Sequence, residues 1–344
     1  MYKRQGVSIP FGEGLNVLIG ENDSGKTSII DAIRYTLGTQ SGEWVRVEET
    51  DFHLEGDDRT NELKIECVFR GFSDREAGSF LEWIGTEEIN GKHGFILKVR
   101  LTARRKADRI VTDIRAGADP VGIVMDGDAR ALLRATYLKP LRDADTELIP
   151  GRRSRFAHIL RAHSLFQKKG VEKHELEVIV GEANQAIKAY FNPNEDGAGA
   201  TILMKALKSY IDAFFPQNEP HEGSVNIAGG DLVDILQRLS LSLDKDSPSG
   251  LGAANLLFMA AELLLLQSEE NLGLRLALVE ELEAHLHPQA QLLLIRYLEE
   301  ESTKGQYILT THSTTMGSSV PLKCLLLCKG NNVFPMACRF TLYN

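Results

Sequence analysis

Residues 15–28 read LNVLIGENDSGKTS, and this stretch decides the fold. It begins with a short apolar run, Leu15 to Ile19, which is typical of a buried β-strand. The next part satisfies the pattern G-x-x-x-x-G-K-[ST] with Gly20, Gly25, Lys26 and Thr27. Helical spacing follows at Ile29, Ile30, Ile33 and Leu37, and Gly38 ends the predicted helix. A strand, a glycine loop and a helix in this order predict a phosphate-binding P-loop.

Each residue type in this loop has a chemical task. The glycines let backbone N–H groups curl around phosphate oxygens, and Lys26 reaches the β- and γ-phosphates of a nucleotide. The hydroxyl of Thr27 is placed to ligate Mg²⁺. We therefore expect ATP and Mg²⁺ as cofactors. The nucleotide-contacting residues of the loop are predicted to be Gly20, Asn22, Asp23, Ser24, Gly25, Lys26, Thr27 and Ser28.

An acidic pair follows a second apolar run, LALV, at residues 276–279. P-loop enzymes need a carboxylate for the metal and a group that activates water. By position, Glu280 would hold Mg²⁺ through water, and Glu281 would orient or deprotonate the attacking water. The alternative is a strand followed by a solvated acidic helix cap. The P-loop upstream favours the metal and water roles.

A third predicted strand, residues 307–310, ends in Thr311, His312 and Ser313. In α/β sheets, ligands bind at the carboxyl ends of the strands. We expect His312 to contact the γ-phosphate and sense hydrolysis, whereas the alternative is a histidine that caps the next short helix. The predicted catalytic residues are thus Glu281, His312 and Lys26.

The composition is that of an ordinary globular protein. Of 344 residues, 43% are hydrophobic and 25% charged, which excludes wholesale disorder. The net charge of -9 excludes a generally basic nucleic-acid coat. The four cysteines show neither a disulfide framework nor a zinc pattern. The N-terminus lacks a secretory signal and the most apolar stretch, 251–266, is too short for a membrane span, so we expect a cytoplasmic protein without a membrane partner.

The chain changes character twice along its length. Residues 62–116 alternate in strand fashion and predict an antiparallel β layer, while residues 151 to about 215 show helical spacing. After residue 230, strands and helices alternate, which implies a mainly parallel sheet. The predicted fold class is α/β, a P-loop NTPase with a mixed sheet, an antiparallel β lobe and a helical insertion. The expected divisions are 1–150, 151–222 and 223–344, the middle one serving as a dimerisation or arm region.

Four segments together resemble a known family. They are NVLIGENDSGKT at 16–27, YLKPLRDA at 137–144, EELEAHLHPQ at 280–289 and TTHS at 310–313. The chain resembles the ABC-type AAA ATPase domain of the RecF/SMC-like group and, more narrowly, the OLD (overcoming lysogenization defect) family of ATP-dependent endonucleases, which includes the Gabija anti-phage nuclease. The resemblance implies an ATPase that acts in DNA-directed defence or repair.

Further roles are implied by this resemblance. Residues 247–252, SPSGLG, occupy the place of the ABC signature motif, so that Ser249 and Gly250 would close over the nucleotide of an opposite subunit in a homodimer. From the residues alone, without the resemblance to the family, the same stretch is interpreted as a turn and a helix N-cap. Residues 285–287 correspond to the D-loop and residues 51–53 to the Q-loop region.

Three departures from the family stand out. Leu282 replaces the usual proline, and the leader Met1 to Gly6 replaces the usual opening strand. The chain also ends where a Toprim nuclease domain would begin, so we expect no nuclease activity from this chain alone. On this interpretation the partner of the chain is a Toprim nuclease domain or an effector protein carried elsewhere.

Two basic clusters are candidate DNA contacts. They comprise Lys98, Arg100, Arg104, Arg105, Lys106 and Arg109, and then Arg152, Arg153, Arg155 and Arg161. The first is equally consistent with a charged strand edge. For Arg142 and Asp143 two roles stay open, ordering the ATPase core or facing the insertion. Two functions remain: a Mg²⁺-dependent ATPase, and an ATP-sensing dimerisation module that gates a nuclease or effector with little hydrolysis of its own.

Overall fold

The computed structural model of the protein describes residues 6–40, 45–56, 58–89, 91–106, 109–138, 149–151, 154–166, 172–191, 199–214, 225, 229–242, 256–261, 273–281, 283, 286–330 and 332–337. The chain divides into two compact units. The first comprises Met1–Asp145 and Leu243–Asn344, and the second comprises Thr146–Ser242. Residues 223–242, which the sequence division placed with the C-terminal part, thus lie in the same unit as the helical segment.

The first unit is built on a six-stranded sheet with the order β13-β12-β1-β11-β10-β9. Its strands are β1 (Leu15–Ile19), β9 (Thr136–Leu138), β10 (Leu276–Val279), β11 (Gln306–Thr311), β12 (Leu325–Lys329) and β13 (Asn332–Pro335). All neighbours are parallel except β12 and β13. The predicted mainly parallel sheet is therefore confirmed. The strand predicted at 322–327 begins only at Leu325, because Pro321 starts a 3-10 turn over Leu322–Cys324.

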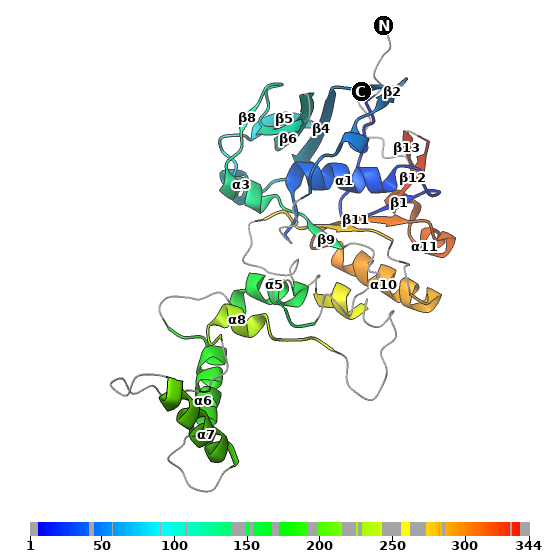
Figure 1. Ribbon diagram of the computed structural model, residues 1–344. Helices are drawn as coiled ribbons and strands as arrows, with labels where there is room; N and C mark the ends of the chain where they lie inside the picture. The colour runs from blue at the N-terminus through cyan, green and yellow to red at the C-terminus, as the bar shows by residue number, and fades with distance from the viewer. Residues whose placement is uncertain are drawn as a thin grey trace. The chain divides into compact units, whose positions relative to one another are not determined.

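Both faces of this sheet are covered, as Figure 1 shows. One face packs against α10 (Pro288–Glu301) and α11 (Thr314–Ser319), and the other against α1 (Lys26–Leu37). Successive side chains of a strand point to opposite faces of the sheet: Val17 packs in the core with α10 and α11, and Leu18 packs in the core with α1. Burial on both faces explains why these strands are continuous apolar runs in the sequence.

An antiparallel lobe covers the outer side of α1. It comprises β4 (Glu62–Arg70), β5 (Gly85–Ile89), β6 (Lys92–Lys106), β7 (Arg109–Ala116) and β8 (Ile123–Val124). Strand β6 pairs with β4, β5 and β7, and every pairing is antiparallel. Leu97 and Val99 of β6 share a core with Ile33 of α1. The antiparallel layer predicted for residues 62–116 is thus confirmed.

Short elements complete the first unit. They are the 3-10 turn η1 (Glu49–Asp51), the hairpin β2 (Leu54–Glu55) and β3 (Asp58–Arg59), and the helices α2 (Asp74–Gly78) and α3 (Gly127–Leu132). Of the apolar helix predicted at 251–267, the structure describes residues 256–261, which are helical.

The second unit is helical where the structure describes it. It contains α5 (Arg155–Ala162), η2 (Ser164–Phe166), α6 (Glu175–Tyr190), α7 (Gly199–Phe214) and α8 (Leu232–Leu236). Ala157, Leu232 and Leu236 form its small core. The carboxylate of Glu177 accepts hydrogen bonds from the backbone N–H groups of Leu232 (2.8 Å) and His174 (3.0 Å), which fastens α6 to α8. Among the residues described in either unit, no helix is long and apolar enough to cross a membrane.

Candidate nucleotide site

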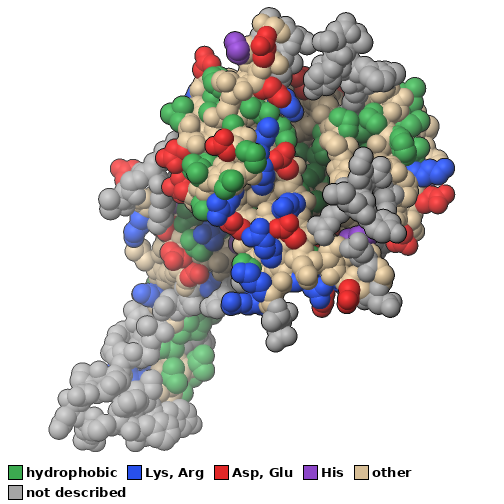
Figure 2. All heavy atoms as spheres, turned by 90° about the horizontal axis from the view of Figure 1, so that it is seen from above, with side chains coloured by type: hydrophobic (Ala, Val, Ile, Leu, Met, Phe, Trp, Pro, Cys, Tyr) green, Lys and Arg blue, Asp and Glu red, His purple; other side chains and the backbone are tan. Residues whose placement is uncertain are grey.

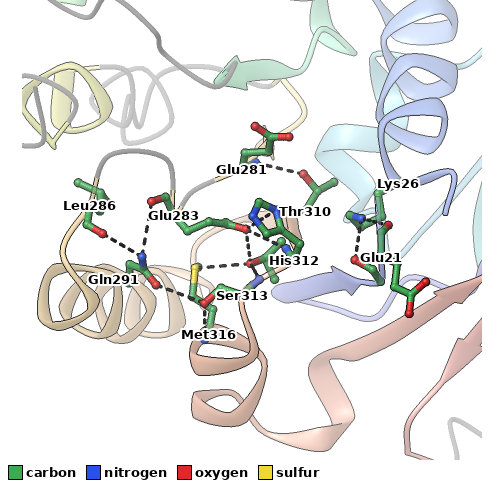
Figure 3. Close-up of polar contacts among 12 residues, drawn as sticks. Glu21, Lys26, Glu281, Glu283, Leu286, Gln291, Thr310, His312, Ser313 and Met316 are labelled. Atoms are coloured by element: carbon green, nitrogen blue, oxygen red, sulfur yellow. Dashed lines mark hydrogen bonds and ion pairs between the residues drawn. The ribbon is translucent and has the colours of Figure 1, made fainter. Parts of the chain in front are cut away.

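Three loops meet at the carboxyl edge of the parallel sheet. Strand β1 leads into the P-loop (residues 20–27), β10 leads to Glu280 and Glu281, and β11 leads to His312. The strands are in close register, since Leu18 lies beside Thr310 and Leu278 beside Ile308. Loops at the carboxyl ends of adjacent parallel strands therefore lie together, as Figure 3 shows for Lys26, Glu281 and His312.

The ammonium group of Lys26 holds the P-loop together. Its Nζ donates to the carbonyl oxygens of Gly20 (2.8 Å) and Glu21 (2.7 Å) and to Ser24 Oγ (3.3 Å). The cation thus lies inside the curl of the loop, where its charge attracts an anion toward the N-terminus of α1. The loop has the charge and the shape of a phosphate cradle.

Two glycines of the P-loop are required by the backbone. Gly25 has a φ of 87°, a left-handed conformation that residues with a Cβ rarely adopt. At Gly20, a Cβ would lie 2.5 Å from the carbonyl oxygen of Cys328 and 2.6 Å from Ser24 Oγ. These constraints explain why positions 20 and 25 are glycine.

Glu280 is a buried carboxylate at the tip of β10, with only 6% of the residue exposed. The hydroxyl of Tyr137 donates a hydrogen bond to Glu280 Oε2, and the side chain of Thr27 lies close enough to the same carboxylate to lower its pKa. Burial raises the pKa of Glu280 above its ordinary value, and the side chains of Tyr137 and Thr27 partly oppose this rise. The structure thus joins the threonine and the first carboxylate that the sequence predicted as metal ligands.

Sequence reasoning assigned no role to Tyr137, although the residue opens a segment that resembles the family. Its ring lies under the guanidinium group of Arg34, which is 3.7 Å from the ring centroid. Arg34 also forms an ion pair with Asp31 at 2.7 Å. Burial, together with the hydrogen bond to Glu280, raises the pKa of Tyr137 strongly, so that the phenol stays protonated and remains a donor.

The second carboxylate of the pair points elsewhere. Glu281 is exposed and has a φ of 46°, a strained conformation for a residue other than glycine. Its backbone N–H donates to Thr310 Oγ1 at 3.2 Å, which stabilises this turn. Adjacent residues are therefore separated into a buried carboxylate and an exposed one.

His312 is held by a residue that the sequence analysis quoted but gave no role, Glu283. One carboxylate oxygen, Glu283 Oε1, lies 2.8 Å from the backbone nitrogen of His312 and 3.1 Å from its ring nitrogen Nδ1. The hydroxyl of Thr311 donates to the same oxygen at 2.8 Å. Figure 3 shows the two side chains pointing toward each other. The sequence feature that could have pointed to Glu283 is that it is a further carboxylate, three residues after Glu280.

Several residues that the sequence singled out lie outside the part of the chain that the structure describes. The signature residues Ser249 and Gly250 lie outside the described residues, as do Arg142, Asp143, His285, Leu282, Arg152 and Arg153. Asp51 of the expected Q-loop region accepts a hydrogen bond from Tyr35 Oη at 2.9 Å and caps η1.

Three of the six residues of the first basic cluster pair with acidic residues. Arg100 pairs with Glu66, and Arg104 with Glu62 at 2.9 Å, across β6 and β4. Arg105 pairs with Glu49. The expectation of a charged strand edge is wrong for Arg100 and Arg104, because β6 pairs with β4 on one side and with β7 on the other at these residues. On the face shown in Figure 2, basic and acidic side chains are interspersed.

Comparisons with known proteins agree with this geometry. A family model described as "AAA domain" matches residues 2–116, and one described as "AAA ATPase domain" matches residues 172–316. The chromosome partition protein Smc of Pyrococcus furiosus is 26% identical over 147 residues, which are 40% of this chain and 12% of that protein. The chain therefore covers only a small part of the length of this relative.

Solved structures resemble the chain over nearly its full length. One of them is the Smc head domain of Pyrococcus furiosus with an extended coiled coil, bound to the C-terminal domain of ScpA. It is 13% identical to this chain, with a TM-score of 0.50, and the match covers 95% of this chain and 90% of the Smc chain. The SMC head domain of Thermotoga maritima is 17% identical over 95% of this chain and 92% of its own, with a TM-score of 0.43. RecF bound to ATP is 12% identical over 96% and 93%, also with a TM-score of 0.43.

The fold and the site define a class of protein. The chain has the α/β fold of a P-loop ATPase domain, like that of an SMC head, and the predicted fold class is confirmed. More particularly, two separate parts of the chain are similar to AAA domains.

Proposed function

We propose that the chain binds ATP with Mg²⁺ at the P-loop and hydrolyses it. The observation that carries this proposal is the closeness of the Thr27 side chain to the buried carboxylate of Glu280, whose pKa it lowers. It joins two hard oxygen ligands, of the kind that Mg²⁺ prefers, beside a loop that is organised for phosphate. No such pairing is required for a strand that merely ends in a solvated acidic cap.

The chain's own residues would share the binding task. Lys26 would exchange its loop acceptors for β- and γ-phosphate oxygens, while the backbone of residues 20–28 surrounds the phosphates. Thr27 and Glu280 would hold Mg²⁺, which when bound neutralises charge on the phosphate oxygens. Because burial raises the pKa of Glu280, metal binding is favoured by the ionised form and releases any proton that the carboxylate holds.

The exposed groups fit the chemical step. Glu281 is exposed next to the buried Glu280 and would orient or deprotonate the attacking water. His312 has 51% of its side chain exposed, and its ring would contact the γ-phosphate. The separation of Glu280 from Glu281 supports different tasks for these two neighbouring carboxylates.

We further propose an OLD-type setting. The four family-like segments of the sequence support an ATPase that acts in DNA-directed defence or repair and cooperates with a Toprim nuclease or another effector. In this setting two copies of the chain would sandwich ATP, with Ser249 and Gly250 of one copy closing over the nucleotide of the other. DNA is a proposed partner, and the relative named chromosome partition protein Smc supports a role connected with DNA.

Two variants test the ATPase proposal. Lys26→Ala should abolish ATP binding, measured by calorimetry, because the cationic partner of the phosphates is lost. Glu281→Gln should bind ATP with the parental Kd and lower kcat about 100-fold or more, as expected for loss of a general base. Parental turnover in Glu281→Gln would show that the catalytic assignment is wrong.

The concentration dependence of turnover separates the enzyme from a sensing module. A site that is completed across a dimer should show a specific activity that rises with protein concentration. An ATP-sensing module should instead dimerise on ATP binding with negligible turnover at every concentration. Light scattering with ATP, measured beside phosphate release on the same samples, distinguishes these outcomes.

A further inference from the structure

We propose that Glu283 is a positioning residue that fixes the ring of His312 for contact with the nucleotide. This inference rests on the proposed ATPase function, in which His312 contacts the γ-phosphate. It concerns a residue outside the P-loop and the Glu280–Glu281 pair.

One carboxylate oxygen of a largely buried side chain receives these contacts. The side chain of Glu283 is 8% exposed, and its Oε1 is the acceptor for the backbone N–H of His312 and the hydroxyl of Thr311. The ring nitrogen Nδ1 of His312 lies 3.1 Å from the same oxygen. The carboxylate therefore holds both the backbone and the side chain of the histidine.

This arrangement decides which ring nitrogen is available. Because a carboxylate is an acceptor, its oxygen 3.1 Å from Nδ1 favours the ring form that carries its proton on Nδ1. Nε2 is then the nitrogen left for a phosphate oxygen or a water molecule. Because half of the His312 side chain is exposed, its χ angles would otherwise be free, and ordering them at the moment of binding costs entropy. Pre-ordering by Glu283 removes this cost in advance.

The segment that carries Glu283 is itself anchored to the loop after β11. Gln291 of α10 donates from Nε2 to the carbonyl oxygens of Leu286 (2.9 Å) and Glu283 (3.5 Å). Its Oε1 accepts from Ser313 Oγ at 3.4 Å, and the N–H of Ser313 donates to Thr311 Oγ1 at 3.0 Å. As Figure 3 shows, the loops after β10 and β11 are thus cross-linked through one side chain of α10. A rigid support of this kind suits a positioning residue.

A double-mutant cycle in the full chain tests the proposal. Glu283→Ala should lower kcat about 10-fold, the scale seen when a residue that orients a functional histidine is removed, with ATP affinity unchanged. In a His312→Ala background, the same substitution should lower kcat by no more than about two-fold, because nothing is left to position.

A conservative variant and a matched control complete the design. Glu283→Gln keeps an oxygen that accepts from Thr311 and from the His312 backbone, so kcat should recover to within about three-fold of parental. Glu300→Ala, an exposed glutamate of α10, should leave kcat unchanged. Melting temperatures and ATP affinities of all variants identify any that lose the fold.

The outcomes distinguish this inference from the function on which it rests. Parental kcat in Glu283→Ala, or independent losses that multiply in the double variant, would overturn the positioning role while leaving the ATPase intact. Parental kcat in His312→Ala would overturn it as well. If the parental chain itself has no turnover, the proposed function fails and the positioning role falls with it.

Discussion

The contact between Tyr137 and Glu280 makes a quantitative prediction for Tyr137→Phe. The substitution removes one hydroxyl and leaves a buried carboxylate with one donor fewer, while the ring remains to pack under Arg34. A hydrogen bond to a charged group contributes about 1.5–3 kcal/mol, so the free energy of unfolding should fall by about 2 kcal/mol. For a domain of this size the melting temperature should fall by about 4–8 °C.

The loss should depend on pH in a defined direction. Burial raises the pKa of Glu280, so the folded state binds this proton more tightly than the unfolded state does. The stability associated with this group is present below the unfolded pKa and is lost as pH rises through the folded pKa. Tyr137 lowers the folded pKa, so its removal raises that pKa further. The variant should therefore lose more stability at about pH 8 than at about pH 5.5, which denaturant titration at both pH values measures.

The same variant tests the metal role of Glu280. Without the phenol, the carboxylate is less fixed and holds its proton more tightly, so the Mg²⁺ concentration for half-maximal ATP turnover should rise about 10-fold. Tyr307→Phe is the matched control, because Tyr307 is a buried tyrosine of the same sheet and lies in the opposite core. A Tyr137→Phe chain with parental melting temperature and parental Mg²⁺ dependence would refute the reasoning.

Two further substitutions test the loop and the β lobe. Gly25→Ala should weaken ATP binding at least 10-fold and lower the free energy of unfolding by about 1–2 kcal/mol, because φ at Gly25 is 87°. Calorimetry measures the affinity and thermal melts measure the stability. An unchanged ATP affinity would contradict the P-loop geometry. Arg104→Ala should lower the free energy of unfolding by less than about 1 kcal/mol, because this arginine already pairs with Glu62 on the surface. For the same reason its DNA affinity should fall less than about two-fold at moderate salt. A large, salt-dependent loss of affinity in a fluorescence anisotropy titration would instead identify a DNA contact.

Local patterns in the sequence were sufficient to predict the helix and strands around the site, together with the P-loop, the acidic pair and His312. The strand, loop and helix of residues 15–37 occur within one run, so periodicity and the positions of Gly20, Gly25 and Lys26 predict them. The acidic pair and His312 follow apolar strands directly. Because parallel strands end at one edge of a sheet, their convergence follows from the fold class.

Only the tertiary structure decided which residues support these groups. Tyr137 and Glu280 are 143 positions apart, and they meet because β9 and β10 are neighbours in the sheet. The alternation along β4 and β6 likewise places acidic residues opposite the arginines, which a count of basic residues along one segment does not reveal. Sequence determines elements whose signals lie within a few turns of chain, whereas the partner of a buried carboxylate depends on strand order, which is set by packing across the whole core.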